Sequence, residues 1–198
     1  MTSASLRVGE DQRSRCGWVG DDAEYRRYHD EEWGVPLHGD RALFEKLSLE
    51  GFQAGLSWIT ILRRRPTFRA AFRDFDVDTV AAFDEADIER LMGDPGIIRN
   101  RAKVEATISN AKITRELTAG DPGALDRLIW SHRPDHANRR RPATLSDVPA
   151  VTPEATALSR ALKKVGYRFV GPTTMYALMQ SAGLVDDHVV GCWRADAA

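Results

Sequence analysis

The chain has 198 residues, of which 42% are hydrophobic and 29% are charged, and its formal net charge at pH 7 is −1. This balance is typical of a globular protein and excludes a disordered or membrane protein, since no apolar run approaches the roughly 20 residues of a membrane helix. We expect one large domain or two small lobes that bury about 70% of the unfolded surface.

The N-terminal segment, MTSASLRVGEDQRSR, is polar and contains no apolar stretch of the kind found in signal peptides. We therefore expect residues 1–14 to form a loose, flexible extension, residues 15–198 to form a single folded unit, and the protein to be cytoplasmic. In that compartment its two cysteines are expected to be free thiols or metal ligands rather than a disulfide.

The first predicted helices lie in the N-terminal third of the chain. Asp21 with Glu24 three positions later forms a capping-box pattern, which predicts the start of a helix. A second helix is expected over residues 40–54. Ser57 can cap a third helix, which we expect Pro66 to interrupt because proline lacks a backbone donor.

The remaining predicted elements are also helices. Asp76 and Asp84 each precede a short helix, and a tight turn over residues 93–96 leads into a long amphipathic one. Thr152, followed by a proline, caps the next helix, and a last apolar helix covers residues 172–183. Alternating strand patterns are scarce, so we predict an all-α fold.

The near-neutral charge argues against nucleic-acid binding, which a basic excess usually accompanies. The two signs are nevertheless segregated along the chain. Arginines cluster at residues 63–65, 99–101 and 139–141, and acidic residues at 21–22, 30–32 and 84–89. Both a phosphate-facing surface and ordinary solvated faces are compatible with this pattern.

Four candidate metal ligands lie near the two ends of the chain. Cys16 and His29 are separated by twelve residues, and His188 and Cys192 by three. Two thiolates and two imidazoles complete a closed tetrahedral shell around zinc, which is typical of a structural site because no position stays open for catalysis. The alternative is two core thiols and two surface histidines.

Glu50 falls on the apolar face of its predicted helix. With about 3.6 residues per turn, it lies between Leu47 and Ala54 on the face that Leu43 begins. A buried carboxylate is costly unless a donor or a cation accompanies it. Glu50 is therefore either half of an internal ion pair with an arginine or a pocket carboxylate for a cationic or N–H-rich ligand.

Aromatic residues crowd the same part of the chain. They are Trp18, Tyr25, Tyr28, Trp33 and Trp58. Tyr25 and Tyr28 share one helix face because they are three residues apart. The rings are either core residues or a box that stacks on a flat ligand, and rings combined with a carboxylate suit a flat cation.

The segment over residues 91–111, LMGDPGIIRNRAKVEATISNA, resembles a helix-hairpin-helix motif. In that motif a glycine-containing hairpin presents backbone N–H groups and a helix N-terminus to a DNA phosphate. Ile98 stands where a second hairpin glycine is usual. An ordinary helical junction in a packed core is the alternative.

Four long blocks resemble, in order, the family of 3-methyladenine DNA glycosylase I. They are RCGWVGDDAEYRRYHDEEWGVP (residues 15–36), LEGFQAGLSWITIL (49–62), GIIRNRAKVEATISNA (96–111) and LKKVGYRFVGPTTMYALMQSAGLVDDHVVGC (162–192). The resemblance implies an all-α helix-hairpin-helix glycosylase fold. It also implies that a structural Zn²⁺ ion ties the two chain ends together through Cys16, His29, His188 and Cys192.

The resemblance assigns roles to the other candidates. Glu50 corresponds to the catalytic carboxylate that hydrogen-bonds the flipped purine, and Tyr28 and Trp58 to its stacking partners. Further lining is expected from Tyr25, Trp18 and Trp33, and DNA contacts from Gly96, Arg99 and Arg101. Phe52 makes the pocket helix more apolar than the family pattern suggests, which bears on fine substrate preference.

The expected reaction is excision of 3-methyladenine, with 3-methylguanine as a second candidate, from alkylated double-stranded DNA by a monomeric enzyme. The N3-methylated purine is cationic, so its glycosidic bond is weak and the base leaves neutral. The enzyme must flip the nucleotide and hold the cation, and a water molecule oriented by Glu50 or a pocket tyrosine then captures the sugar. No lysine nucleophile is implied, so the strand stays intact.

Two other functions compete with this one. A zinc-stabilised DNA-binding module would bind damaged DNA without releasing a base. A hydrolase that uses the metal directly would need an open metal position, which a shell of four protein ligands denies.

Overall fold

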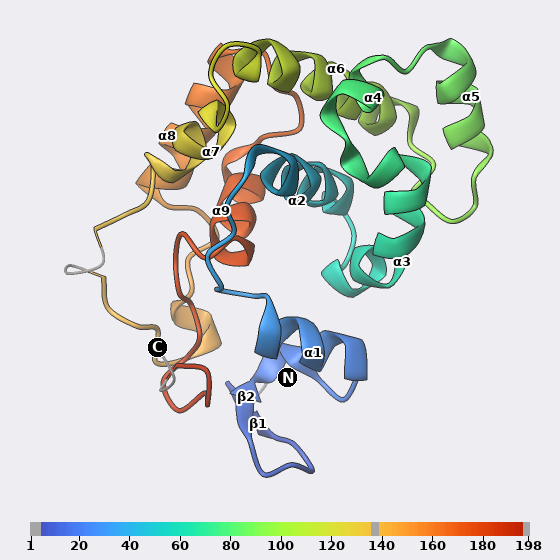
Figure 1. Cartoon of the computed structure of the whole chain (residues 1–198). Helices are drawn as coiled ribbons and strands as arrows, with labels where there is room; N and C mark the ends of the chain where they lie inside the picture. Colours follow the sequence, from blue (N-terminus) through green and yellow to red (C-terminus); the bar gives the residue numbers. More distant parts are fainter. Residues whose placement is uncertain (1–4, 136–138, 196–198) are drawn as a thin grey trace.

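The computed structural model describes residues 5–135 and 139–195. These residues are mostly helical, which confirms the predicted fold class at that level, and none of their helices is long and apolar enough to cross a membrane. Figure 1 shows α2 (Asp40–Gln53) near the centre with α9 (Pro172–Ser181) beside it. Both chain ends lie on the side opposite α6 (Arg101–Thr118).

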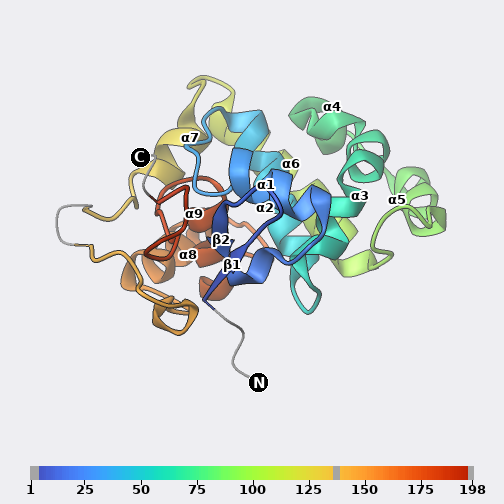
Figure 2. The same ribbon diagram turned by 90° about the horizontal axis from the view of Figure 1, so that it is seen from below.

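The described N-terminal residues form a hairpin. β1 (Leu6–Val8) pairs antiparallel with β2 (Ser14–Cys16), and the short turn η1 (Gly17–Val19) follows. The expectation of a loose extension over residues 1–14 is therefore wrong for the part of it that lies in this hairpin, whose strands are too short to show a strand periodicity. Trp193 N donates to Ser14 O at 2.8 Å, and both views place the hairpin beside the C-terminal segment (Figure 1, Figure 2).

The hairpin is also joined to the first helix, α1 (Ala23–Glu31). The buried guanidinium of Arg15 binds the Asp30 carboxylate at 2.7 Å. The N-cap of α1 is Asp22, whose side chain accepts a backbone hydrogen bond from the first turn, so the predicted start at Asp21 is wrong by one residue.

Other helices enclose α2. It packs against α3 (Trp58–Ala71), α6 and α9, and every residue over 43–52 except Glu45 is buried. A helix buried on nearly all sides has no polar face, so two charged residues, Lys46 and Glu50, are buried together with the apolar ones.

α3 continues through Pro66, and the predicted interruption is wrong. Pro66 is exposed, whereas Ile61, Leu62 and Phe68 on either side of it are buried. Packing of this apolar face keeps the chain helical although one backbone donor is missing.

Three short elements follow, namely η2 (Arg73–Phe75), α4 (Val77–Ala81) and α5 (Glu85–Gly93). Asp76 caps α4 and Asp84 caps α5, as predicted. In both caps the carboxylate accepts hydrogen bonds from backbone N–H groups that the helix itself leaves unpaired.

The connection from α5 to α6 packs against α3. Arg64 Nη1 donates to Pro95 O at 2.8 Å and to Ile97 O at 3.1 Å, and Thr67 Oγ1 donates to Gly96 O at 2.6 Å. A Cβ atom on residue 96 would lie 3.0 Å from the Thr67 Cβ, so this close approach favours glycine. The predicted turn between two helices is present here.

α7 (Ala124–Trp130) and the short η4 (Leu145–Asp147) were not predicted from the sequence. α8 (Pro153–Lys164) begins as predicted, because Thr152 Oγ1 accepts a hydrogen bond from Ala155 N at 3.2 Å. It packs against α9, which is the last helix of the described chain.

The end of α9 touches the link between α1 and α2 through backbone atoms. Leu37 N donates to Ala182 O at 3.0 Å. Gly183 has φ +74°, and a Cβ there would lie 2.4 Å from the carbonyl carbon of Val35. Only glycine fits, because both the backbone angle and the contact exclude a side chain.

We predict that Gly183→Ala lowers the free energy of unfolding by about 2–3 kcal/mol, because it adds a backbone clash to a left-handed conformation. Chemical denaturation measures the change. Gly120→Ala is the matched control, because Gly120 has open space around its Cα and no positive φ. Equal stability of the two variants would contradict the tight contact.

Candidate functional site

A cavity of about 380 Å³ lies where α1, η1, α2, α3 and α9 meet. All six side chains predicted to form a pocket line it, together with seven others that the sequence analysis missed. The lining residues are Trp18, Tyr25, Tyr28, Trp33, Glu50, Gln53, Trp58, Leu145, Val148, Ala177, Gln180, Ser181 and Asp187.

The missed residues fall into two groups. Gln53 lies one turn after Glu50 on α2 and could have been found from that spacing. The others lie on or just after η4, or on or after α9. They are more than 90 residues from Glu50 in the sequence, so no local pattern connects them to the pocket.

Aromatic rings form much of the cavity wall. Ring centroids are 4.9 Å apart for Trp18 and Tyr25, 5.1 Å for Trp18 and Trp33, and 5.4 Å for Tyr28 and Trp58. The pairs are tilted or edge-on, which is the geometry that aromatic pairs prefer. Trp58 Nε1 is buried and has no hydrogen-bond partner within the described chain, so the wall contains an unused donor.

Glu50 is the buried carboxylate of the cavity, with 3% of its surface exposed. Its Oε1 accepts a hydrogen bond from Ser181 Oγ at 2.8 Å. Burial raises the pKa of Glu50 to about 7, although the Lys46 charge and the Ser181 hydrogen bond act in the opposite direction. The alternative of an ion pair with an arginine is wrong, because among the described residues no arginine binds this carboxylate.

The two tyrosines next to Glu50 are held in their neutral form. Burial, and secondly the Glu50 charge, raise the pKa of both Tyr25 and Tyr28 above its ordinary value. Both phenols therefore remain protonated near neutral pH and can donate hydrogen bonds to a ligand.

Asp187 is a second buried carboxylate on the cavity wall. It accepts hydrogen bonds from Tyr176 Oη at 2.6 Å and Gln180 Nε2 at 2.8 Å, and the Arg139 guanidinium also binds it. With its acceptor positions used by protein donors, Asp187 fixes the chain after α9, whereas Glu50 has one such donor and can accept more.

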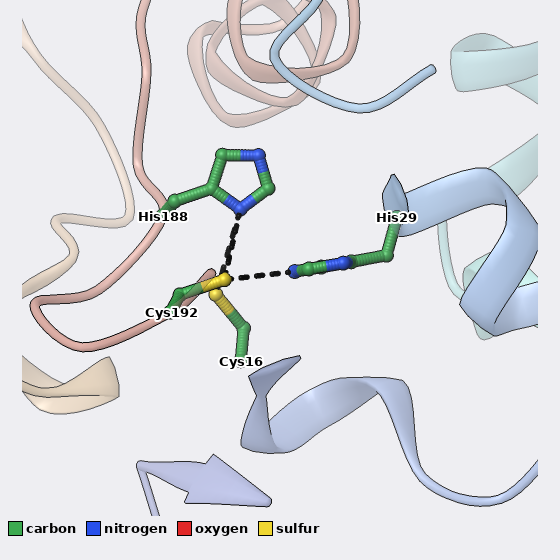
Figure 3. A group of neighbouring side chains, drawn as sticks. All are labelled: Cys16, His29, His188 and Cys192. Carbon is green, nitrogen blue, oxygen red and sulfur yellow. Dashed lines mark hydrogen bonds between the residues drawn. The ribbon is translucent and has the colours of Figure 1, made fainter. Parts of the chain in front are cut away.

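The four predicted metal ligands converge at one point (Figure 3). The Cys192 Sγ atom lies 3.5 Å from His29 Nε2 and 3.6 Å from His188 Nδ1, and Cys16 Sγ lies 3.8 Å from the same His188 atom. A tetrahedral zinc site with ordinary bond lengths places sulfur and nitrogen ligands about 3.5 Å apart. All four side chains are buried, so the alternative of surface histidines is wrong.

The surroundings of the cluster also fit a cation. His29 Nδ1 donates to Asp30 Oδ1 at 2.8 Å and His188 Nε2 donates to Trp33 O at 3.2 Å, which directs the other ring nitrogen of each histidine to the centre. The pKa of the Cys16 thiol lies well above its ordinary value because of its hydrogen bond to Cys192 and its burial. Both thiols ionise together only if a cation neutralises them.

The cluster and the cavity share a wall. The Trp18 ring lies 5.3 Å from the His29 ring, and the Trp33 ring lies 4.7 Å from the His188 ring, edge-on in both cases. The two tryptophans therefore contact the histidines of the cluster on one side and line the cavity on the other.

The side chains predicted to contact DNA lie around the α5–α6 turn. Gly96 N donates to Asp94 Oδ1 at 2.7 Å, and Arg101 binds the carboxylates of Glu85 and Glu89. Arg99 is exposed. The Gly96 backbone amide and the Arg101 guanidinium therefore already bind carboxylates of the turn and of α5.

Arginines of the other two clusters, over residues 63–65 and 139–141, also form ion pairs with acidic residues of the same chain. Arg65 binds Glu32, and Arg141 binds Asp186.

Phe52, which was expected to affect the pocket, packs instead in the core, where its ring lies 4.7 Å from the Phe68 ring.

Comparisons with known proteins agree with one another. A family model described as methyladenine glycosylase matches residues 18–195. DNA-3-methyladenine glycosylase 1 of Escherichia coli (strain K12) is 49% identical over 178 residues, which cover 90% of this chain and 95% of that protein. A crystal structure of 3-methyladenine DNA glycosylase I matches with a TM-score of 0.85 at 46% identity, over 90% of this chain and 98% of the other. A crystal structure of a variant 3-methyladenine DNA glycosylase I in complex with 3-methyladenine has a TM-score of 0.81 at 35% identity, over 90% and 96% of the two chains.

We predict that Glu50 makes the protein less stable as the pH rises from 4.5 to 7. In this window the folded chain keeps a proton that the unfolded chain has released, because the pKa of Glu50 rises from 4.5 to about 7 on folding. Its contribution to the free energy of unfolding therefore falls by about 3 kcal/mol across the window. Glu50→Gln should match the wild type near pH 4 and exceed it near pH 8 in urea denaturation.

Glu45→Gln is the matched control for that measurement, because Glu45 lies on the same helix and pairs with Arg69 near the surface. A difference between Glu50→Gln and the wild type that does not change with pH would show that Glu50 ionises as freely as in the unfolded chain.

Proposed function

The chain belongs to the methyladenine glycosylase family, and from this membership we propose that it excises 3-methyladenine from alkylated DNA by hydrolysing the N-glycosidic bond, as a step of base-excision repair. The observation that carries the proposal is the buried Glu50 carboxylate, which accepts a hydrogen bond only from Ser181 among the described residues, inside an aromatic cavity of about 380 Å³. That volume is in the range of small-ligand sites, and the ring-and-carboxylate lining suits a flat cation.

The target nucleotide must leave the duplex before the cavity can receive the base. Flipping costs a few kcal/mol in lost stacking and pairing, which contacts inside the cavity must offset. Tyr28 and Trp58 stack on the base, and Trp18, Tyr25 and Trp33 complete the lining. The unpaired Trp58 Nε1 and the tyrosine hydroxyls supply donors, and Glu50 accepts from the base.

Recognition then depends on charge. The N3-methylated purine carries a positive charge, and the Glu50 carboxylate interacts with it strongly in a site of low dielectric constant. Neutral adenine gains no such attraction. The same argument admits 3-methylguanine as a second substrate, since it carries the same charge.

The bond-breaking step needs little acid catalysis. The C1′–N9 bond breaks, its electron pair goes to the base, and the base leaves neutral. A water molecule adds to the oxocarbenium-like C1′ and releases a proton to Glu50, to a pocket tyrosine or to solvent, which leaves an abasic site. The mechanism contains no lysine nucleophile, so the DNA strand is not cleaved.

Zinc is the metal that the cluster of Cys16, His29, His188 and Cys192 suits best. Two thiolates and two imidazoles at tetrahedral spacing are the ligands of structural zinc sites, and the closed shell leaves no position for substrate. The role of the metal is therefore to hold the chain ends together. A reaction at the metal itself, the rival hydrolase mechanism, is disfavoured for the same reason.

The DNA-contacting surface is assigned to the α5–α6 turn as a helix-hairpin-helix element that binds the backbone of double-stranded DNA. Arg99 is the exposed cation of this turn, while Arg101 and Gly96 contact phosphate only if they exchange their present carboxylate partners. The enzyme acts as a monomer, with residues 15–198 as one glycosylase unit against which the β1–β2 hairpin packs.

The excision assay tests the role of Glu50. Glu50→Gln keeps the size of the side chain but replaces an anionic acceptor with an amide. The loss of one charge-assisted hydrogen bond is expected to slow single-turnover release of 3-methyladenine from methylated duplex DNA by about ten- to a hundredfold. Glu45→Gln should keep full activity.

Thermal melting of the same samples separates this effect from a folding defect. Excision that stays unchanged in Glu50→Gln, or that declines only as far as the protein unfolds, would assign Glu50 a structural role. Binding of methylated DNA without base release by the wild type would support the rival DNA-binding module.

A second prediction concerns the metal. Purified protein should contain about one zinc ion per chain by elemental analysis. His188→Ala and Cys192→Ser should lose it and melt at lower temperature, because a structural zinc site stabilises by on the order of 10 kcal/mol in small peptides and by less in a domain with its own core. His132→Ala, which removes an imidazole outside the cluster, should retain the metal. Metal-free protein with unchanged melting would refute the site.

A further inference from the structure

Lys46 is a second charged group beside the cavity, and the mechanism above does not use it. It lies on α2 one turn before Glu50, and only 7% of its surface is exposed. Residues four apart on a helix are neighbours on one face, with Cβ atoms about 5–6 Å apart. The side chains of Lys46 and Glu50 therefore start from neighbouring positions on one face of α2.

The Lys46 ammonium lies over aromatic rings rather than beside a carboxylate. Its Nζ atom is 5.2 Å from the centre of the Tyr28 ring and 5.5 Å from the centre of the Trp58 ring. Within the described chain it forms no ion pair and donates no hydrogen bond. Burial lowers the pKa of Lys46, which the charges of Glu50 and Glu32 partly oppose.

A buried cation without a direct partner is unfavourable, and an apolar side chain of the same length would fill the position without that penalty. Lys46 faces a smaller cavity of about 200 Å³ that it lines together with Ser181, the residue that donates to Glu50. Tyr28 and Trp58 line the larger cavity, so their rings separate the ammonium from a bound base.

The other charged groups near Lys46 have partners of their own. Glu32 on α1 and Arg65 on α3 bind each other at 2.8 Å, and Glu45 on α2 binds Arg69. The Lys46 charge acts on both Glu32 and Glu50, but Glu32 already has Arg65 as a direct partner, whereas Glu50 has no other cation in the part of the chain that the structure describes.

Glu50, in turn, faces few charged or ionisable groups. Tyr25 and Tyr28 of α1 stay neutral near pH 7, and α9 contributes only the Ser181 hydroxyl. Asp187 lines the same cavity but is bound by its own donors. Lys46 is the cation whose field favours the ionised form of Glu50.

We propose that Lys46 is a positioning residue for the reaction: its ammonium favours the ionised form of the Glu50 carboxylate in the empty cavity, so that in a larger share of the protein the flipped cationic base meets a negative charge that is already formed. The proposal rests on the proposed role of Glu50 in base binding. It follows that Lys46 sets the lowest pH at which the enzyme captures its substrate.

The test is Lys46→Met, which removes the charge and keeps an unbranched side chain. The titration of Glu50 is followed directly in the ligand-free protein by carbon NMR of its carboxyl group. Its midpoint should rise by about one pH unit or more, because a cation one helical turn away has been removed. The acid limb of the kcat/KM profile for 3-methyladenine excision should move to higher pH by the same amount, with the plateau above it retained.

Lys112→Met is the matched control, because Lys112 is an exposed lysine on α6 and its loss changes the net charge equally. It should leave both midpoints in place. In Lys46→Met combined with Glu50→Gln, excision should no longer depend on pH in this range. Melting curves check that Lys46→Met folds, and its melting temperature should equal or exceed that of the wild type.

A Glu50 midpoint that does not move in Lys46→Met overturns the proposal, whatever happens to excision. If the midpoint rises and the excision profile stays in place, Lys46 controls the charge of Glu50 as inferred, and it is the base-binding role of Glu50 that fails. The two conclusions can therefore be separated.

Discussion

The convergence of Cys16, His29, His188 and Cys192 determines where the cavity can form. Cys16 and His188 are 172 positions apart in the sequence, yet their ligand atoms lie 3.8 Å apart. The chain from Cys16 to just after His29 carries four of the aromatic residues of the cavity wall, Trp18, Tyr25, Tyr28 and Trp33. Because Trp18 and Trp33 also pack on the histidine rings, any loosening of the cluster displaces the wall.

The other side of the cavity belongs to the helical core. α2 presents Glu50 from a position enclosed by α3, α6 and α9, and Ser181 on α9 binds its carboxylate. If these helices moved apart, water would reach the Glu50 carboxylate and weaken its interaction with a cation, because electrostatic attraction decreases as the dielectric constant rises. The packed helix α2 on one side and the cysteine–histidine cluster on the other thus have the same effect, which is to shield the Glu50 carboxylate from water and to fix its position.

The sequence predicted those features that depend on local chemistry. The helix caps at Asp76, Asp84 and Thr152 were found because a capping residue acts within four positions of itself. The continuation of α3 through Pro66 and the short N-terminal hairpin were missed, since distant packing decides both. Lys46 was missed for a related reason: the periodicity of α2 predicts one buried stripe, whereas helices cover it on nearly every side. The pocket residues and metal ligands came from the family resemblance more than from spacing.

The buried charges of α2 explain why such a site can be selective and still fold. An ionised Glu50 is unfavourable in the empty cavity, as its raised pKa indicates, and Lys46 lessens that penalty without occupying the cavity. In the function proposed above, a cationic base that enters relieves the remaining penalty by direct contact, whereas a neutral base leaves it in place. Deeper burial of Glu50 therefore increases both the selectivity for the charged base and the free-energy penalty of the empty site. The stability of the surrounding helices limits how large this penalty can be.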